Sequence, residues 1–195
     1  IVSESANPTK VSLIQFQIGL LASAKEIQVN LRELASNSNT STTSGLKKIL
    51  QETTLSLLRK PELWVYSNIE TGSVPFASAE STFNRISIAE RSKLNAELTS
   101  NYSGQISTSN NTEANPGDSD PTNEYIAITI LVATKNDLRL NNSANSELIT
   151  ETLHLLGAIT SNDLIALEVI WQPEGEGESL REEELITKYP NLKHL

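Results

Sequence analysis

The stretch EYIAITILVAT, residues Glu124–Thr134, is an almost uninterrupted apolar run rich in β-branched residues. Alternate side chains of a strand point to opposite faces, so a strand that is apolar throughout is normally covered on both faces. A second run, LIALEVIW (Leu164–Trp171), stops before Pro173, which cannot donate to a strand ladder. Between them, Glu147–Leu156 has apolar residues at helical spacing and precedes Gly157, an expected helix cap. We therefore predict a strand–helix–strand unit whose first strand lies inside the sheet.

The other strands and helices are predicted from the same two periodicities. Val11–Leu21 alternates apolar residues with Gln15, Gln17 and Gly19, which indicates one apolar and one wetter face. Leu63–Ile69 has strand composition, and the following Thr71-Gly72-Ser73 predicts a turn. The predicted helices are Ala24–Ala35, Gly45–Arg59 with Thr42 as its N-cap, Ala77–Thr99, Glu147–Leu156, and a short one within Leu185–Leu192.

These elements predict one α/β (α+β) domain over residues 1–195, in two layers, with a mixed four-stranded sheet packed against helices. Within the long third helix, we expect apolar residues such as Phe83 and Ile86 to face inward. Glu90, Arg91 and Lys93 are expected in water.

Two segments have neither strand nor helix periodicity. Residues at about 102–123 are mostly Ser, Asn, Thr, Gly and Pro, without Lys or Arg. Such a composition cannot offset its ordering entropy by burial, so we predict a mobile polar loop within the domain. Residues 174–184 (EGEGESLREEE) form an acidic segment that we expect to be solvated.

Composition excludes several classes of function. A net charge of −9 disfavours binding to a nucleic-acid backbone and direct attraction to anionic lipid. The chain has no cysteine, and His154 has no second His or Cys at ligand spacing, so we predict no metal site and no cofactor. There is no apolar run of about 18 residues that could span a bilayer.

We predict no catalytic residue, but three features leave two interpretations open. Glu168 interrupts an apolar strand, either because it takes an edge position or a salt bridge to an arginine such as Arg85, or because it is an acid that contacts a ligand. Trp64 and Trp171 lie on predicted strands, where they either pack in the protein or form an exposed binding patch. The last feature is a run of acids that either maintains solubility or binds a basic protein partner, in a contact that weakens as salt rises: Glu182, Glu183 and Glu184.

Five stretches of the chain, in the same order, resemble one family: the domain of unknown function 1517, found in cyanobacteria and plant plastids. The resemblance covers nearly the whole chain apart from the polar loop. The stretches are KVSLIQFQIGLLASAKEIQ (Lys10–Gln28), TSTTSGLKKILQETTLSLLRKPELWVY (Thr40–Tyr66), FNRISIAERSK (Phe83–Lys93), EYIAITILVAT (Glu124–Thr134) and LGAITSNDLIALEVIWQP (Leu156–Pro173).

This resemblance implies the soluble domain of a membrane-anchored protein associated with photosynthetic (thylakoid) membranes, and it implies no catalytic residues. We expect contact with the membrane only through a tether upstream of Ile1. The function that we predict is a non-catalytic protein-interaction or regulatory module with a protein partner. The alternative is a small-molecule-binding domain or enzyme with a pocket at the strand ends, which would be marked by a titratable group of strongly shifted pKa in an apolar pocket.

Overall fold

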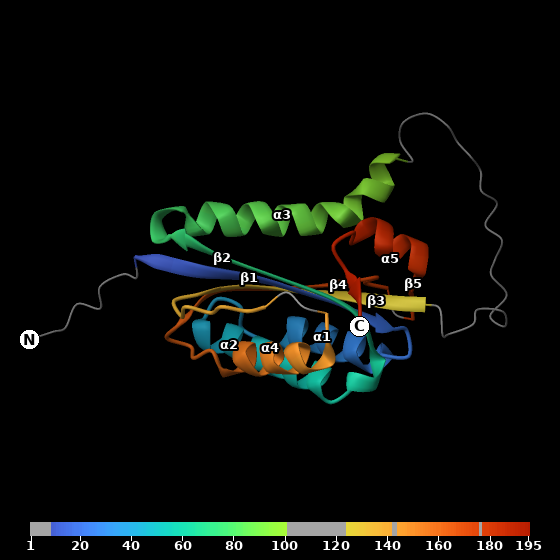
Figure 1. Ribbon diagram of the computed structural model, residues 1–195, viewed down its shortest axis with the longest axis horizontal. Helices are drawn as coiled ribbons and strands as arrows, with labels where there is room; N and C mark the ends of the chain where they lie inside the picture. The colour runs from blue at the N-terminus through green and yellow to red at the C-terminus, as the bar shows by residue number, and fades with distance from the viewer. Residues whose placement is uncertain (1–8, 101–123, 142–143, 176) are drawn as a thin grey trace, which may run out of the picture.

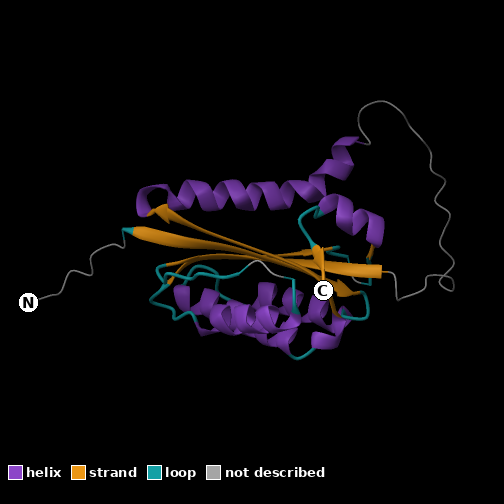
Figure 2. Cartoon of the chain, in the orientation of Figure 1, coloured by secondary structure: helices purple, strands orange, loops and turns teal. Residues whose placement is uncertain are grey.

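The computed structural model describes residues 9–100, 124–141, 144–175 and 177–195 (Figure 1). Long strands alternate with helices along these residues (Figure 2). The predicted loop at about 102–123 lies outside the described residues. The elements in chain order are β1 (Lys10–Leu21), α1 (Lys25–Asn37), α2 (Thr43–Leu58), a 3-10 turn (Pro61–Leu63), β2 (Trp64–Pro75), α3 (Phe76–Ser100), β3 (Glu124–Thr134), α4 (Ser146–Ala158), β4 (Leu164–Gln172), β5 (Leu180–Arg181), α5 (Glu182–Lys188) and β6 (Lys193–His194).

One sheet forms the centre of the domain. Its strand order is β4-β3-β1-β2-β6, and β5 pairs with the start of β3. Because β3 lies between β4 and β1, the prediction that Glu124–Thr134 is an interior strand is confirmed. The α/β class is also confirmed, but the prediction of a mixed four-stranded sheet is wrong. Within the part of the chain that the structure describes, all strand pairs are antiparallel, and the two-residue strands β5 and β6 bring the sheet to six strands.

Neighbouring strands are antiparallel because each helical connection between them begins and ends at the same end of the sheet. The α1–α2 pair lies between β1 and β2 and brings the chain back to the same end of the sheet, where Leu20 is opposite Trp64. The connection through α4 does the same, with Thr134 opposite Leu164. Neighbouring strands are parallel only when a connection crosses to the opposite end. Among the described elements, only α3 lies in such a connection, and β1 separates the two strands β2 and β3 that the connection joins.

Helices cover both faces of the sheet, so the domain has three layers and not the predicted two (Figure 1). On one face lie α1, α2 and α4, and on the other lie α3 and α5. The face under α1, α2 and α4 carries the main apolar core, where burial of each large side chain contributes about 1.5–3 kcal/mol. Its fully buried members include Phe16, Ile18, Ile128, Leu50 and Leu153.

The opposite face of the sheet is apolar at both ends and polar at its centre. Under the start of α3, Leu13 and Ala79 belong to one small apolar cluster, and Leu185 of α5 belongs to another at the far end. Between them lie Gln17 and Thr129, only 3% and 1% exposed. The long helix α3 therefore covers a polar layer, consistent with the wetter face predicted for β1.

The strand boundaries are mostly as predicted. The bounds of β3 are identical, and those of β1 and β4 differ by one residue. β2 is longer than predicted, because Glu70–Pro75 continues the strand opposite Lys10–Gln15. The turn predicted at Thr71-Gly72-Ser73 is therefore wrong: pairing along the full length of β1 overrides the local preference.

At the helix ends, one predicted cap is present and another is not. The Thr42 hydroxyl accepts a hydrogen bond from the Gly45 N–H at 3.0 Å, as expected for the N-cap of α2. Gly157 is not the cap of α4, which continues to Ala158. A Cβ at Gly157 would lie 2.9 Å from Thr54 Oγ1 on α2. The glycine therefore permits close packing of α4 against α2.

The end of the acidic segment is helical. Glu182 begins α5, so the last helix starts before the predicted Leu185. Carboxylates in the first turn of a helix are favoured by the partial positive charge of the backbone there. Residues 182–184 thus form the start of a helix, in which Glu182 and Glu183 are exposed, as expected for a solvated segment, and Glu184 is partly buried.

Candidate functional site

A buried polar cluster joins α3 to the centre of the sheet. Glu90 of α3 is 5% exposed and accepts hydrogen bonds from Gln15 Nε2 at 2.7 Å and Gln17 Nε2 at 3.0 Å. Lys93 donates to both oxygens of the same carboxylate at 2.7 and 2.9 Å. Gln17 also accepts from Asn68 at 3.2 Å. Such a satisfied network fixes the position of a helix. Helical periodicity alone predicts that Glu90 and Lys93 face water. The glutamines of β1 are the signal in the sequence that a polar face of the sheet lies against them.

Glu168 ties the edge strand β4 to α3. Its carboxylate accepts a hydrogen bond from the Ser87 hydroxyl and forms an ion pair with Arg91. Its side chain is 14% exposed, whereas that of Arg91 is 65% exposed. The interpretation of Glu168 as an edge residue in an ion pair is therefore confirmed, with Arg91 as the partner in place of Arg85.

Beside α5, a group of tyrosines has raised pKa values. The Tyr66 hydroxyl donates to the Glu182 carboxylate, and the Tyr66 ring packs edge-on against Tyr125 with centroids 5.6 Å apart. Burial, followed by the hydrogen bond to Glu182 and its charge, raises the pKa of Tyr66 well above its usual value. Burial followed by a nearby carboxylate also raises the pKa of Tyr125 and of Tyr189, through Glu182 and Glu90 respectively. Near neutral pH these phenols therefore stay protonated and do not act as bases.

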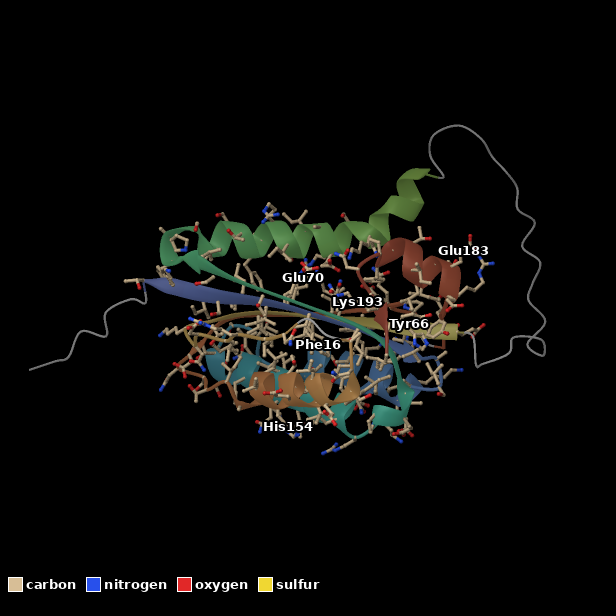
Figure 3. The ribbon with its side chains drawn as sticks, viewed as in Figure 1. Phe16, Tyr66, Glu70, His154, Glu183 and Lys193 are labelled. Carbon is tan, nitrogen blue, oxygen red and sulfur yellow. The ribbon has the colours of Figure 1, made fainter. Side chains whose placement is uncertain are left out.

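The three glutamates that open α5 have different surroundings. Glu182 accepts from Tyr66, as described above. Glu184 accepts from the backbone N–H of Arg181 at 2.8 Å in a capping box. Burial acts to raise the pKa of Glu184, but the hydrogen bonds and charge of Arg181 outweigh it and lower that pKa below its usual value. Glu183 lies at the surface on the outer side of α5 (Figure 3). Their predicted binding of a basic partner stays a prediction.

The two tryptophans lie in different places. Trp64 is 7% exposed, and its indole N–H donates to the Leu57 carbonyl at 3.1 Å. This is the packing interpretation, and a role for Trp64 in binding stays a prediction. Trp171 is partly exposed near the end of β4, and its buried Nε1 has no hydrogen-bond partner among the described residues. Of the two, Trp171 is the one that lines a surface groove.

That groove, of about 500 Å³, follows the outer edge of β4. Among the described residues, β4 pairs with β3 alone, so its other edge is free. Leu167 and Val169 enter the groove from one face of β4, and Glu168 from the other. The helices on both sides contribute the remaining wall, mainly through Leu31, Leu34, Ala35, Leu46, Ile49 and Arg91. Sequence reasoning missed this groove for two reasons. The leucines that line it have the spacing of core residues, and periodicity does not predict which strand lies at the edge of the sheet.

Two hollows at opposite ends of the strands differ in charge. At the start of β1, a hollow of about 510 Å³ is lined by Lys10, Lys135 and Arg139, with Asp137 among them. At the other end, a hollow of about 610 Å³ lies beside α5. Its charged lining residues are Glu124, Glu174, Glu178, Glu184 and Lys188.

Within the described ranges, no group of three or more His, Cys, Asp and Glu side chains could hold a metal ion. His154 lies on the outer surface of α4, away from the sheet (Figure 3). No helix in this part of the chain is both long and apolar enough to cross a membrane.

Comparisons with known proteins identify relatives over almost the whole chain. The chain is 40% identical over 197 residues to Protein FLAP1 homolog A of Synechocystis sp.. This alignment covers 98% of the chain and 59% of the relative. The chain is 36% identical over 188 residues to FLUCTUATING-LIGHT-ACCLIMATION protein 1, chloroplastic, of Arabidopsis thaliana, covering 95% of this chain and 47% of that relative. The chain thus spans about half the length of these curated relatives. No solved structure matches it.

The family described as "Protein of unknown function (DUF1517)" matches residues 10–195. This range begins at the first residue of β1 and ends at the last residue of the chain, so it takes in every strand and helix described above. The chain therefore belongs to the DUF1517 family, as the resemblance of its sequence predicted.

Proposed function

We propose that this chain is a non-catalytic protein-interaction domain that binds an extended segment of a partner protein along the free edge of β4. The observation that carries this proposal is the groove at that edge. Side chains on opposite faces of one strand, such as Leu167 and Glu168, line a single groove only where the strand edge itself is open. A partner strand can therefore reach the unpaired backbone groups of β4.

Strand addition fits the chemistry of this edge. Backbone N–H and C=O groups of an edge strand give affinity by pairing, and pockets for alternate side chains give specificity. Here the leucines of α1 and α2 with Leu167 and Val169 provide an apolar pocket. The partly exposed Trp171 ring extends this apolar lining toward the end of β4.

The alternative function, a small-molecule binder or enzyme, has less support from the titratable groups. The tyrosines with raised pKa values stay protonated, and Glu182 already accepts a hydrogen bond from Tyr66. Glu184 lines the acidic hollow, but its lowered pKa arises from its contacts with Arg181 at the start of α5. These shifts have structural causes and do not match a base prepared for catalysis.

The relatives supply the proposed setting. One is named for acclimation to fluctuating light and is chloroplastic, and the other is its cyanobacterial homologue. These names support our proposal that the domain belongs to a protein of light acclimation in a plastid or a cyanobacterium, where it has a regulatory role. Association with a thylakoid membrane, through a segment outside the domain, rests on the family resemblance.

The groove can be tested with two lysine substitutions on neighbouring residues of α1. Ala35 is exposed and lines the groove, whereas the exposed Ser36 does not. Full-length protein carrying Ala35→Lys or Ser36→Lys is captured from native membranes, and the recovered proteins are compared with those of the wild type. We expect Ala35→Lys to reduce recovery of a partner at least fivefold, while Ser36→Lys leaves it unchanged. Equal recovery by both variants would contradict the groove as the binding surface.

A further inference from the structure

The basic hollow, the cavity of about 510 Å³ where β1 begins, lies at the end of the sheet opposite α5 (Figure 1). Ser12 of β1 and Ser73 of β2 are direct partners in the sheet, so their side chains lie on the same face. Thr71 lies on that face too, because it is opposite Ile14, a member of the main apolar core. Hydroxyl groups from both strands therefore line the hollow.

The loop that follows β3 forms the other wall of the basic hollow and has a defined position. The Lys135 N–H donates to the Asp163 carbonyl at 2.9 Å. Further along the loop, Leu138 and Leu140 pack against the main apolar core. All residues that line the hollow lie within the part of the chain that the structure describes. The wall is thus anchored at its start by the backbone and beyond it by apolar packing.

The lining is positively charged, although the chain as a whole has a net charge of −9. Its basic residues are Lys10, Lys135 and Arg139, and its acid is Asp137. Asp137 pairs with Arg139 at 3.4 Å, but their side chains are 72% and 89% exposed, and such a surface ion pair adds little stability. Neither lysine forms an ion pair with a described residue. Three basic residues against one acid leave an excess of positive charge for an anion.

Ser12 gives a second, independent sign that a ligand belongs in the basic hollow. The residue is only 5% exposed, and its hydroxyl makes no hydrogen bond with a described residue. It lines the hollow, and its oxygen is not one of the fully enclosed polar atoms, so the hydroxyl can be reached from the cavity. Buried polar groups are nearly always paired, since an unpaired one loses its hydration with no return. The hollow therefore has a hydroxyl donor beside its positive charges.

We propose that the basic hollow binds the phosphate monoester group of a small, water-soluble ligand. Near neutral pH this group has a charge of about −1.5 to −2 and three strong acceptor oxygens. These match the positive charge of the lining and its ammonium, guanidinium and hydroxyl donors. A phosphodiester of a nucleic acid or a lipid carries about one negative charge, on a surface that the net charge of −9 repels.

The size of the basic hollow favours a small ligand over a phosphorylated segment of a partner protein. Its volume of about 510 Å³ lies within the range of small-molecule sites, roughly 300–1,000 Å³. The residues beside a phosphorylated side chain need further surface, and the groove along β4 shares no lining residue with this hollow. The inference goes beyond the proposed interaction function. It adds a ligand site at the strand ends, and either proposal can fail without the other.

The test uses the whole chain, with binding of phenyl phosphate followed by NMR chemical shifts. Lys135→Gln removes a charge from the hollow, and Lys48→Gln is the matched control at an exposed position of α2 outside it. Ser12→Ala removes the unpartnered hydroxyl. We expect Lys135→Gln and Ser12→Ala each to weaken binding at least fivefold, with Lys48→Gln within twofold of the wild type. Thermal unfolding, expected to be unchanged, checks that each variant is folded.

Phenyl sulfate, which has a similar shape but one negative charge, should bind the wild type at least fivefold more weakly than phenyl phosphate at pH 7.5. Equal binding of the two probes, or binding by Ser12→Ala equal to that of the wild type, would overturn the inference. Equal weakening by Lys135→Gln and Lys48→Gln would mean general attraction to basic residues and would do the same.

Two further probes distinguish the possible sources of the phosphate group. Tighter binding of acetyl-Gly-phosphoserine-Gly amide than of phenyl phosphate would assign the hollow to a phosphorylated partner protein. Flotation with vesicles that contain phosphatidic acid, a lipid that ends in a phosphate monoester, would assign it to a membrane. Either result would overturn the proposal of a small, water-soluble ligand, which predicts neither.

Discussion

Glu90 shows at the scale of a single residue how a buried charge is accommodated in this domain. The carboxylate is buried, but two glutamine amides and the Lys93 ammonium donate to it. A buried ion pair adds little stability over a well-packed apolar pair. Removal of one partner, in contrast, leaves the other charge buried and unpaired. The cluster is therefore expected to be sensitive to removal of either partner alone.

We expect Glu90→Leu to lower the free energy of unfolding by about 3 kcal/mol, because Lys93 and the amides of Gln15 and Gln17 lose their acceptor. In a domain of this size that corresponds to a fall in Tm of roughly 6–12 °C. Thermal and urea unfolding measure both quantities. The double variant Glu90→Leu/Lys93→Met should lose less than the sum of the two single variants.

The matched control for that prediction is Glu80→Leu, at an exposed position on the same helix, expected within about 0.5 kcal/mol of the wild type. A Glu90→Leu variant as stable as Glu80→Leu would show that the buried cluster does not hold α3.

At the scale of elements, sequence periodicity predicts the long strands and each α-helix of the described ranges, but not their arrangement. The apolar run Glu124–Thr134 is unambiguous because both of its faces are buried. The extension of β2 through Gly72 depends on pairing with β1, which is remote in sequence. Trp171 was selected as a candidate from its residue type, but its groove exists only because β4 is an edge strand. Long-range pairing decides such features, and a local pattern does not record it.

Close packing between α2 and α4 gives a prediction at this scale. A Cβ on Gly157 would lie 2.9 Å from Thr54 Oγ1, a buried atom that donates to the Gln51 carbonyl. We expect Gly157→Ala to cost about 1 kcal/mol net, since overpacking exceeds the gain in helix propensity. In a Thr54→Ala background the same substitution should be neutral or stabilising. Chemical denaturation of the four proteins measures this coupling.

Gly72→Ala serves as the control for that cycle, because a Cβ there meets no atom within 4 Å. If Gly157→Ala is equally destabilising with Thr54 and with Ala at position 54, the contact between the two helices is not the reason for the glycine.

At the scale of the whole molecule, charge is distributed unevenly along the strands. Four carboxylates line the hollow beside α5, and three basic residues line the hollow at the opposite end of the sheet, where β1 begins. The net charge of −9 nevertheless dominates at a distance. A surface with the same sign of charge therefore repels the domain unless the basic end alone makes contact.

This charge balance predicts that residues 1–195 do not bind anionic vesicles on their own. With a net charge of −9, the chain should be repelled over about one Debye length, roughly 8 Å at physiological salt. Flotation with vesicles rich in anionic lipid, and with neutral vesicles as the control, should leave the protein at the bottom of the gradient in both cases. Flotation with anionic vesicles only would contradict the prediction. Lys135→Glu/Arg139→Glu would then show whether the basic hollow is responsible, because these substitutions reverse its charge and leave the acidic end unchanged.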